Sequence, residues 1–92
     1  MDRFEEMNVF VKVAESAGFA AAARRLNLSP PTVTRAIAAL EARIGATLFA
    51  RTTRSVRLTE AGQRYFEDCR RILAELQDME EIALGAHAMP RG

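Results

Sequence analysis

The chain has 92 residues, of which 49% are hydrophobic and 27% are charged, and its formal net charge is +1. This length corresponds to about one domain, and the composition is typical of a folded globular chain and excludes a disordered one. No apolar run approaches the ~20 residues that span a bilayer, and the acidic N-terminus differs from a signal peptide. The single cysteine, Cys69, excludes an intramolecular disulfide and suits a reducing compartment. We therefore expect a cytoplasmic protein.

The charges are distributed unevenly along the chain. Residues 24–64 contain eight arginines and two glutamates, whereas residues 1–23 and 65–92 carry net charges of −2 and −3. A basic middle between acidic ends is typical of a nucleic-acid-binding surface. A mixed, solvated surface is the alternative interpretation of the charges taken alone.

Two helices are predicted in the first third of the chain. Apolar residues at helical spacing predict a helix over residues 3–17, with a capping box formed by Asp2 and Glu5 and with Gly18 ending the helix. A shorter helix follows over residues 19–27, and a tight turn comes after it. The apolar residues that define the first helix are Phe4, Met7, Phe10, Val11, Ala14 and Ala17.

The segment SPPTVTRAIAALEARIG predicts a third helix, with Ser29 as its cap, Pro30 in its first position and Gly45 at its end. A spacing of 100° per residue places Val33, Ile37, Leu40 and Ile44 on the buried stripe. The opposite face is centred on Arg35 and otherwise carries small residues, namely Pro31, Thr32, Thr34, Ala38, Ala39 and Ala42.

A small outward face with one arginine fits the major groove of DNA without steric or charge conflict. We also expect the free N–H groups of the first turn of this helix to favour phosphate oxygens. An ordinary solvated helix face would carry Glu, Lys and Gln instead. The alternative is an alanine-rich surface helix with one unrelated arginine.

Residues 47–59 predict a β-hairpin with a polar RTTRS segment between its apolar strands. A short helix, a turn, a second helix with an exposed basic face and then a hairpin describe a helix-turn-helix with a wing. Arg54 and Arg57 lie near the tip of this wing, where they would reach the DNA backbone or the minor groove.

A fourth helix is predicted from Thr59, its cap, to about Gly85, and it is longer than so small a domain can cover. Its apolar residues follow a heptad spacing, which predicts that two chains pair through this helix. A helix packed only within its own chain is the alternative. The predicted dimer interface consists of Tyr65, Cys69, Ile72, Leu76, Met79 and Ala83.

The sequence resembles the N-terminal DNA-binding domain of LysR-type transcriptional regulators over essentially residues 4–85. The resemblance implies a mainly α fold, a winged helix-turn-helix of three helices and a two-stranded β-wing over residues 1–58. It also implies a long dimerisation helix over residues 59–85 and the start of a hinge over residues 86–92. A larger domain that binds a small-molecule effector would follow and is absent from this chain. The residues that carry the resemblance are Phe19, the alanines at 20–23, Leu26, Ser29, Val33, Thr34, Ile37, Leu40, Glu41, Gly45, Leu48, Phe49, Arg51, Leu58, Thr59, Glu60, Ala61 and Gly62.

The resemblance further implies a bacterial, nucleoid-associated transcription regulator that binds double-stranded DNA by sequence as a homodimer, at an interrupted palindromic operator. Pro30 and Ala38 stand where the family often has long polar residues, so the base sequence that is read would differ. The expected base-reading residues are Pro30, Pro31, Thr32, Thr34 and Arg35. The residues expected on the backbone or in the minor groove are Ser29, Arg51, Thr52, Thr53, Arg54, Ser55 and Arg57.

No catalytic, metal or cofactor site is predicted. His87 is the only histidine and lies in a loop-like tail, and Cys69 falls on an apolar stripe, where a buried structural thiol is expected. Glu41 is expected to pair with a nearby arginine, because a free carboxylate would repel phosphate. The alternative function is a helical protein–protein interaction module without a DNA role; an enzyme is not expected.

Overall fold

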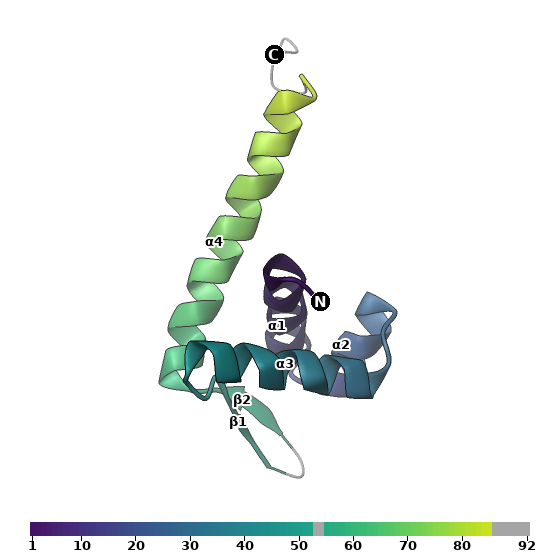
Figure 1. Ribbon diagram of the computed structural model, residues 1–92, viewed down its shortest axis with the longest axis vertical. Helices are drawn as coiled ribbons and strands as arrows, with labels where there is room; N and C mark the ends of the chain where they lie inside the picture. Colours follow the sequence, from purple (N-terminus) through teal and green to yellow (C-terminus); the bar gives the residue numbers. More distant parts are fainter. Residues whose placement is uncertain (53–54, 86–92) are drawn as a thin grey trace.

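The computed structural model describes residues 1–52 and 55–85 of the chain. These residues form a winged helix-turn-helix followed by a long helix (Figure 1). None of the helices in this part of the chain combines the length and the apolar content that crossing a membrane requires. The elements in chain order are α1 (Arg3–Ser16), α2 (Phe19–Leu26), α3 (Pro30–Ile44), β1 (Phe49–Arg51), β2 (Val56–Leu58) and α4 (Glu60–Ala83).

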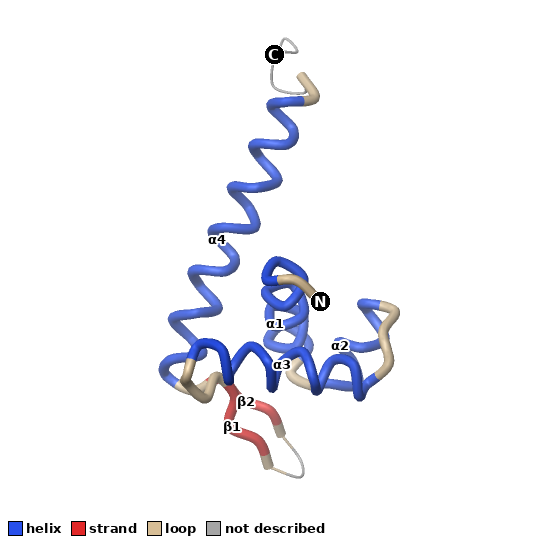
Figure 2. The backbone as a smooth tube through the Cα atoms, viewed as in Figure 1, coloured by secondary structure: helices blue, strands red, loops and turns tan. Residues whose placement is uncertain are grey.

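The helices α1, α2 and α3 pack together, and α4 leaves this group from the C-terminal end of α3 (Figure 1). The two strands pair antiparallel, with Phe49 opposite Leu58 and Arg51 opposite Val56. Figure 2 shows that this hairpin extends away from the helices, on the side opposite to the far end of α4. The long helix and the wing therefore project from the same small core in different directions.

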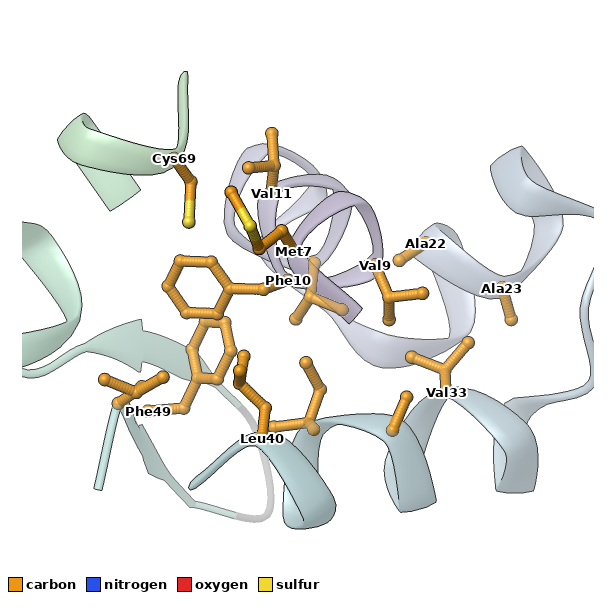
Figure 3. Close-up of a cluster of buried hydrophobic side chains, with 14 residues drawn as sticks. Met7, Val9, Phe10, Val11, Ala22, Ala23, Val33, Leu40, Phe49 and Cys69 are labelled. Carbon is orange, nitrogen blue, oxygen red and sulfur yellow. The ribbon is translucent and has the colours of Figure 1, made fainter. Parts of the chain in front are cut away.

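The core is centred on Phe10 of α1, whose side chain is completely buried. Its ring lies 5.1 Å from the ring of Phe49 and 5.1 Å from the ring of Tyr65, measured between centroids. The buried side of α3 and the buried thiol of Cys69 complete the cluster (Figure 3). The first half of α4 is therefore part of the same core as the wing, and only its second half extends beyond the domain.

Side chains cap three of the four helices as expected. Asp2 and Glu5 form a capping box at the start of α1. The hydroxyl of Ser29 accepts from the backbone N–H of Thr32 at 3.2 Å, and the hydroxyl of Thr59 accepts from that of Gly62 at 2.9 Å. These local signals set the starts of α1, α3 and α4.

The expectations for α1 were wrong in two respects. The helix ends at Ser16, and Ala17, with φ 55°, takes the left-handed conformation, whereas Gly18 is extended and precedes α2. An alanine accepts this conformation at a cost of about 1–2 kcal/mol. In addition, the apolar spacing does not match the buried side of the helix: Phe4, one of the residues that defined it, is 53% exposed, while Val9 and Val13, which it left out, are buried.

The two following helices differ from expectation at their ends. The helix α2 ends at Leu26, and Asn27, with φ 58°, makes the left-handed turn that leads to α3. Ile44, placed on the buried stripe from the sequence, is 39% exposed, because α3 reaches the edge of the core one turn earlier. Ala36, which the predicted stripe did not include, is buried.

Candidate nucleic-acid interface

The outward face of α3 is exposed along its length. Pro31, Thr34, Arg35, Ala38 and Ala42 are all exposed, and the opposite side of the helix is packed against α1 and α2. The exposed position predicted for Arg35 is therefore confirmed. The face has no carboxylate, since the one acidic residue of α3, Glu41, lies on its flank.

The first turn of α3 orients Arg35. The hydroxyls of Ser29 and Thr32 share a hydrogen bond at 2.7 Å, and an Nη2 group of Arg35 lies 3.5 Å from the hydroxyl oxygen of Thr32. Thr32 is thus half-buried and engaged with its neighbours, unlike the freely exposed residue that the sequence predicted. Arg35 also borders an open hollow of 390 Å³ between α1 and α3.

The prediction of free N–H groups in this first turn was wrong. Pro30 and Pro31 have no N–H group, and the N–H groups of Thr32 and Val33 donate to the hydroxyl and the carbonyl of Ser29. The two prolines therefore remove the donors that a helix N-terminus usually offers to a phosphate. Any contact between this turn and a polyanion must come from side chains.

The wing presents Arg51 and Arg57 at exposed positions. The guanidinium of Arg51 lies 4.9 Å from the ring centroid of Phe19, a cation–π contact that joins β1 to the start of α2. Thr52 and Ser55 close the hairpin on each other, because the N–H of Ser55 donates to the hydroxyl of Thr52 at 3.0 Å. The other two predicted wing residues, Thr53 and Arg54, lie outside the described residues.

Glu41 does not form the expected ion pair in the described part of the chain. Its carboxylate oxygen Oε2 accepts from the backbone N–H groups of Leu48 and Phe49, at 2.7 Å and 3.2 Å. This carboxylate therefore holds the start of β1 against α3. The sequence pattern gave no sign of this contact, since its partners are backbone groups seven and eight residues away.

The arginines near α3 differ in their charge compensation. Arg43 pairs with the buried Glu6 of α1, and Arg25 lies 3.7 Å from Glu15. Among the residues that the structure describes, the exposed arginines that form no ion pair are Arg3, Arg24, Arg35, Arg51, Arg57, Arg64 and Arg70. The surface around α3 and the wing is consequently positive.

The predicted dimer stripe of α4 divides into two parts. Tyr65 is half-buried against Phe10, and Cys69 is only 1% exposed, so these two residues belong to the core of their own chain. A heptad spacing cannot distinguish a stripe that faces its own domain from one that faces a partner. Beyond them the stripe is more exposed: Ile72 is 39% and Met79 61% exposed, Ala83 is exposed and Leu76 is half-buried.

Burial changes the titration of the two core groups. It raises the pKa of the Tyr65 hydroxyl to about 12, with a smaller contribution from Cys69. It also raises the pKa of the Cys69 thiol. Both groups therefore stay protonated near neutral pH, which suits a structural thiol rather than a nucleophile. Within residues 1–52 and 55–85 no group of three His, Cys, Asp or Glu side chains is placed to hold a metal ion.

Curated relatives are similar to this chain over most of its length. The chain is 41% identical to the "HTH-type transcriptional activator AaeR" of Escherichia coli K12 over 92 residues, which covers 100% of the chain and 30% of that protein. It is 48% identical over 84 residues to an "HTH-type transcriptional regulator" of Xanthomonas campestris, covering 91% of the chain and 24% of that protein. The chain thus spans less than a third of the length of these relatives.

Solved structures share the fold. The CbnR DNA-binding domain in a DNA complex is 43% identical, with a TM-score of 0.82, and the match covers 97% of this chain and 100% of that one. The BenM DNA-binding domain in complex with catB site 1 DNA is 25% identical, with a TM-score of 0.88, over 99% and 100% of the two chains. Residues 4–63 match the family described as "Bacterial regulatory helix-turn-helix protein, lysR family". The chain belongs to this family.

Proposed function

We propose that the chain binds double-stranded DNA by sequence, as a homodimer, with α3 in the major groove and the wing on the backbone or in the minor groove. The observation that carries this proposal is the exposed, carboxylate-free face of α3 around Arg35. Similar domains, those of CbnR and BenM, have been solved in complex with DNA, which supports the same role here.

The face of α3 suits a major groove in size and in chemistry. The groove is about 12 Å wide and admits one helix, and the exposed Ala38 and Ala42 keep the outward side of α3 narrow. Arg35 would donate to guanine O6 and N7, Thr34 would contact a neighbouring base edge, and Pro30 and Pro31 would pack on thymine methyl groups. Thr32 would hold Arg35 in place through the hydroxyl that lies beside its guanidinium.

The wing and the capping hydroxyl would position the domain on the phosphate backbone. Arg51 and Arg57 are exposed on the two strands, and Ser29 lies at the end of α3 that would enter the groove. Thr52 and Ser55 would contribute hydroxyls next to the turn that they close. Thr53 and Arg54 are assigned to this group from the sequence.

The far half of α4 would supply the dimer contact. Ile72, Met79 and Ile82 of α4 are 39%, 61% and 60% exposed, and Leu84, directly after the helix, is 86% exposed. A run of large exposed apolar side chains of this kind marks an interaction surface. Pairing two such helices would present two copies of α3 to successive major grooves, about 34 Å apart along one duplex.

Selection from a pool of random duplexes tests the proposal. The chain should enrich a related set of sequences, and affinity for the recovered duplex should fall as salt rises. Replacing Arg35 with alanine should weaken binding to that duplex by about 1–3 kcal/mol and relax the preference at one base position. The matched control is Arg71→Ala, which removes an arginine that pairs with Asp68 on α4, away from α3.

Three outcomes would contradict the proposal. The pool could yield no enriched sequence, the affinity could be independent of salt, or Arg35→Ala and Arg71→Ala could weaken binding equally. The absence of any salt-dependent affinity for DNA would favour the alternative of a helical protein-interaction module.

A further inference from the structure

We infer that Glu41 is a positioning residue that fixes the angle between the wing and α3, so that both elements engage one duplex at the same time. This inference rests on the proposed DNA-binding function. It assigns to the one acidic residue of α3 a role in DNA binding that acts through the hairpin and not through contact with DNA.

The contact joins the helix directly to the first strand. Both bonds end on a single carboxylate oxygen, Oε2 of Glu41, and they come from the N–H groups of Leu48 and Phe49. Leu48 and Phe49 are 1% and 4% exposed, so these N–H groups lie at the edge of the core. A buried N–H group without a partner costs about 1–3 kcal/mol, and Glu41 satisfies two of them from the flank of α3.

The opposite side of the same segment is held by the start of α4. The N–H of Thr59 donates to the carbonyl of Leu48 at 3.0 Å, and the hydroxyl of Thr59 donates to the carbonyl of Thr47 at 2.7 Å. Residues 47–49 are therefore fixed on one side by α3 and on the other by α4. Without Glu41 the segment would keep its hydrogen bonds to Thr59 and the packing of Phe49 on Phe10, but it would lose its hydrogen bonds to α3. The angle between the hairpin and α3 would then be less tightly fixed.

The negative charge of Glu41 is unfavourable next to DNA, so its position is best explained by its hydrogen bonds to the hairpin. Glu41 lies between the exposed face of α3 and the wing, where a negative charge would repel DNA phosphates. Simple charge considerations thus predict that its removal strengthens binding, whereas a positioning role predicts that loss of the two hydrogen bonds weakens it. The two explanations differ in sign.

Two substitutions separate charge from reach. Glu41→Asp keeps the charge but shortens the side chain by one methylene, so it no longer reaches both N–H groups. Glu41→Gln removes the charge but keeps an oxygen at the same distance, and one oxygen accepts both bonds in the structure. Glu67→Asp, a change in an exposed carboxylate of α4, is the matched control.

The probe is the duplex recovered by the unaltered 92-residue chain, and affinity is measured across a range of salt concentrations. We expect Glu41→Asp to bind about tenfold more weakly, with the salt slope reduced by about two, because the wing of each protomer in the dimer loses a phosphate contact. Glu41→Gln should keep the salt slope of the unaltered chain. A partly unfolded variant would lose affinity without a change in slope, so the slope distinguishes positioning from stability.

The inference is overturned if Glu41→Asp binds as the unaltered chain does, or if both variants keep the full slope while Glu41→Gln binds more tightly. If the unaltered chain binds no duplex, the proposed function fails and this inference fails with it. If the unaltered chain binds and only the variants behave otherwise, the proposed function stands.

Discussion

The side chain of Tyr65 is half-buried where the first turns of α4 pack against the core. Its ring packs edge-on against Phe10, and burial raises its pKa to about 12 from an ordinary value of 10.0. The unfolded chain therefore releases this proton at a lower pH than the folded chain does. The stability that the folded chain owes to the protonated Tyr65 hydroxyl is fully present below pH 10, and it is lost as the pH rises toward 12.

Alkaline titration checks this behaviour, because Tyr65 is the only tyrosine and the chain has no tryptophan. The ultraviolet absorbance of tyrosinate should appear with a midpoint near pH 12 in the folded chain, and the free energy of unfolding should decrease between pH 10 and 12. Tyr65→Phe should reduce this decrease and leave the part due to Cys69, whose pKa burial also raises. A tyrosinate midpoint near 10 in the folded chain would contradict the assignment.

Exposure of Arg35 and the capping of α3 by Ser29 were predictable from the sequence, because both depend on residues within one or two helical turns. The lack of free N–H groups in the first turn of α3 was predictable in principle as well. Two of its residues are prolines, which have no N–H group, and the capping serine accepts from the next one. The role of Glu41 was not, because its partners belong to a strand whose place against α3 depends on the whole fold.

At the scale of elements, the start of α4 and the base of the wing are packed without room to spare. A Cβ atom added to Gly62 would lie 2.0 Å from the carbonyl oxygen of Leu48 and 2.9 Å from its carbonyl carbon. Both are backbone atoms that Thr59 also holds, so they cannot move aside without moving the hairpin. Glycine at this position is thus required by the close approach of α4 to the strand.

Gly62→Ala should lower the free energy of unfolding by about 1–3 kcal/mol, because overpacking here outweighs the higher helix propensity of alanine. Urea unfolding followed by circular dichroism measures the change. The control, Gln63→Ala, alters the next and exposed residue of α4 and should change the free energy by less than about 0.5 kcal/mol. Equal stability of Gly62→Ala and the unaltered chain would show that the hairpin adjusts freely.

The helices themselves were predicted with small errors at their ends, and the reasons are tertiary. Ala17 adopts a left-handed conformation although glycine follows it, because the path between α1 and α2 needs that bend one residue earlier than local preference suggests. Phe4 is exposed because α1 begins beyond the part of the core that its neighbours cover. Periodicity identifies a helix, but the packed neighbours decide which face is buried.

At the scale of the whole molecule, α4 has two functions along its length. Its first half closes the core through Cys69, and its second half carries apolar side chains that the described chain leaves uncovered. The sequence predicted one continuous stripe, since spacing alone does not show where the domain ends. The proposed dimer contact is consequently shorter than the predicted one and begins near Ile72.

Sedimentation of the 92-residue chain tests the dimer. Met79 lies in the centre of the proposed contact and is 61% exposed in the single chain. Met79→Glu places a charge in the contact and should therefore shift the protein from dimer to monomer without unfolding it. Ala74→Glu adds the same charge at an exposed position on another side of α4 and should leave the dimer intact. A monomer for the unaltered chain, or equal behaviour of the two variants, would contradict the proposed contact.

The small side chains on the outside of α3 have an evolutionary consequence. Ala38 and Ala42 are exposed, and the core is built from the opposite side of the helix. A longer side chain at either position would therefore alter the surface that α3 offers to a binding partner, with almost no change in the free energy of unfolding. Gene duplicates of such a domain could diverge in target preference through single substitutions, while the scaffold that carries them stays the same.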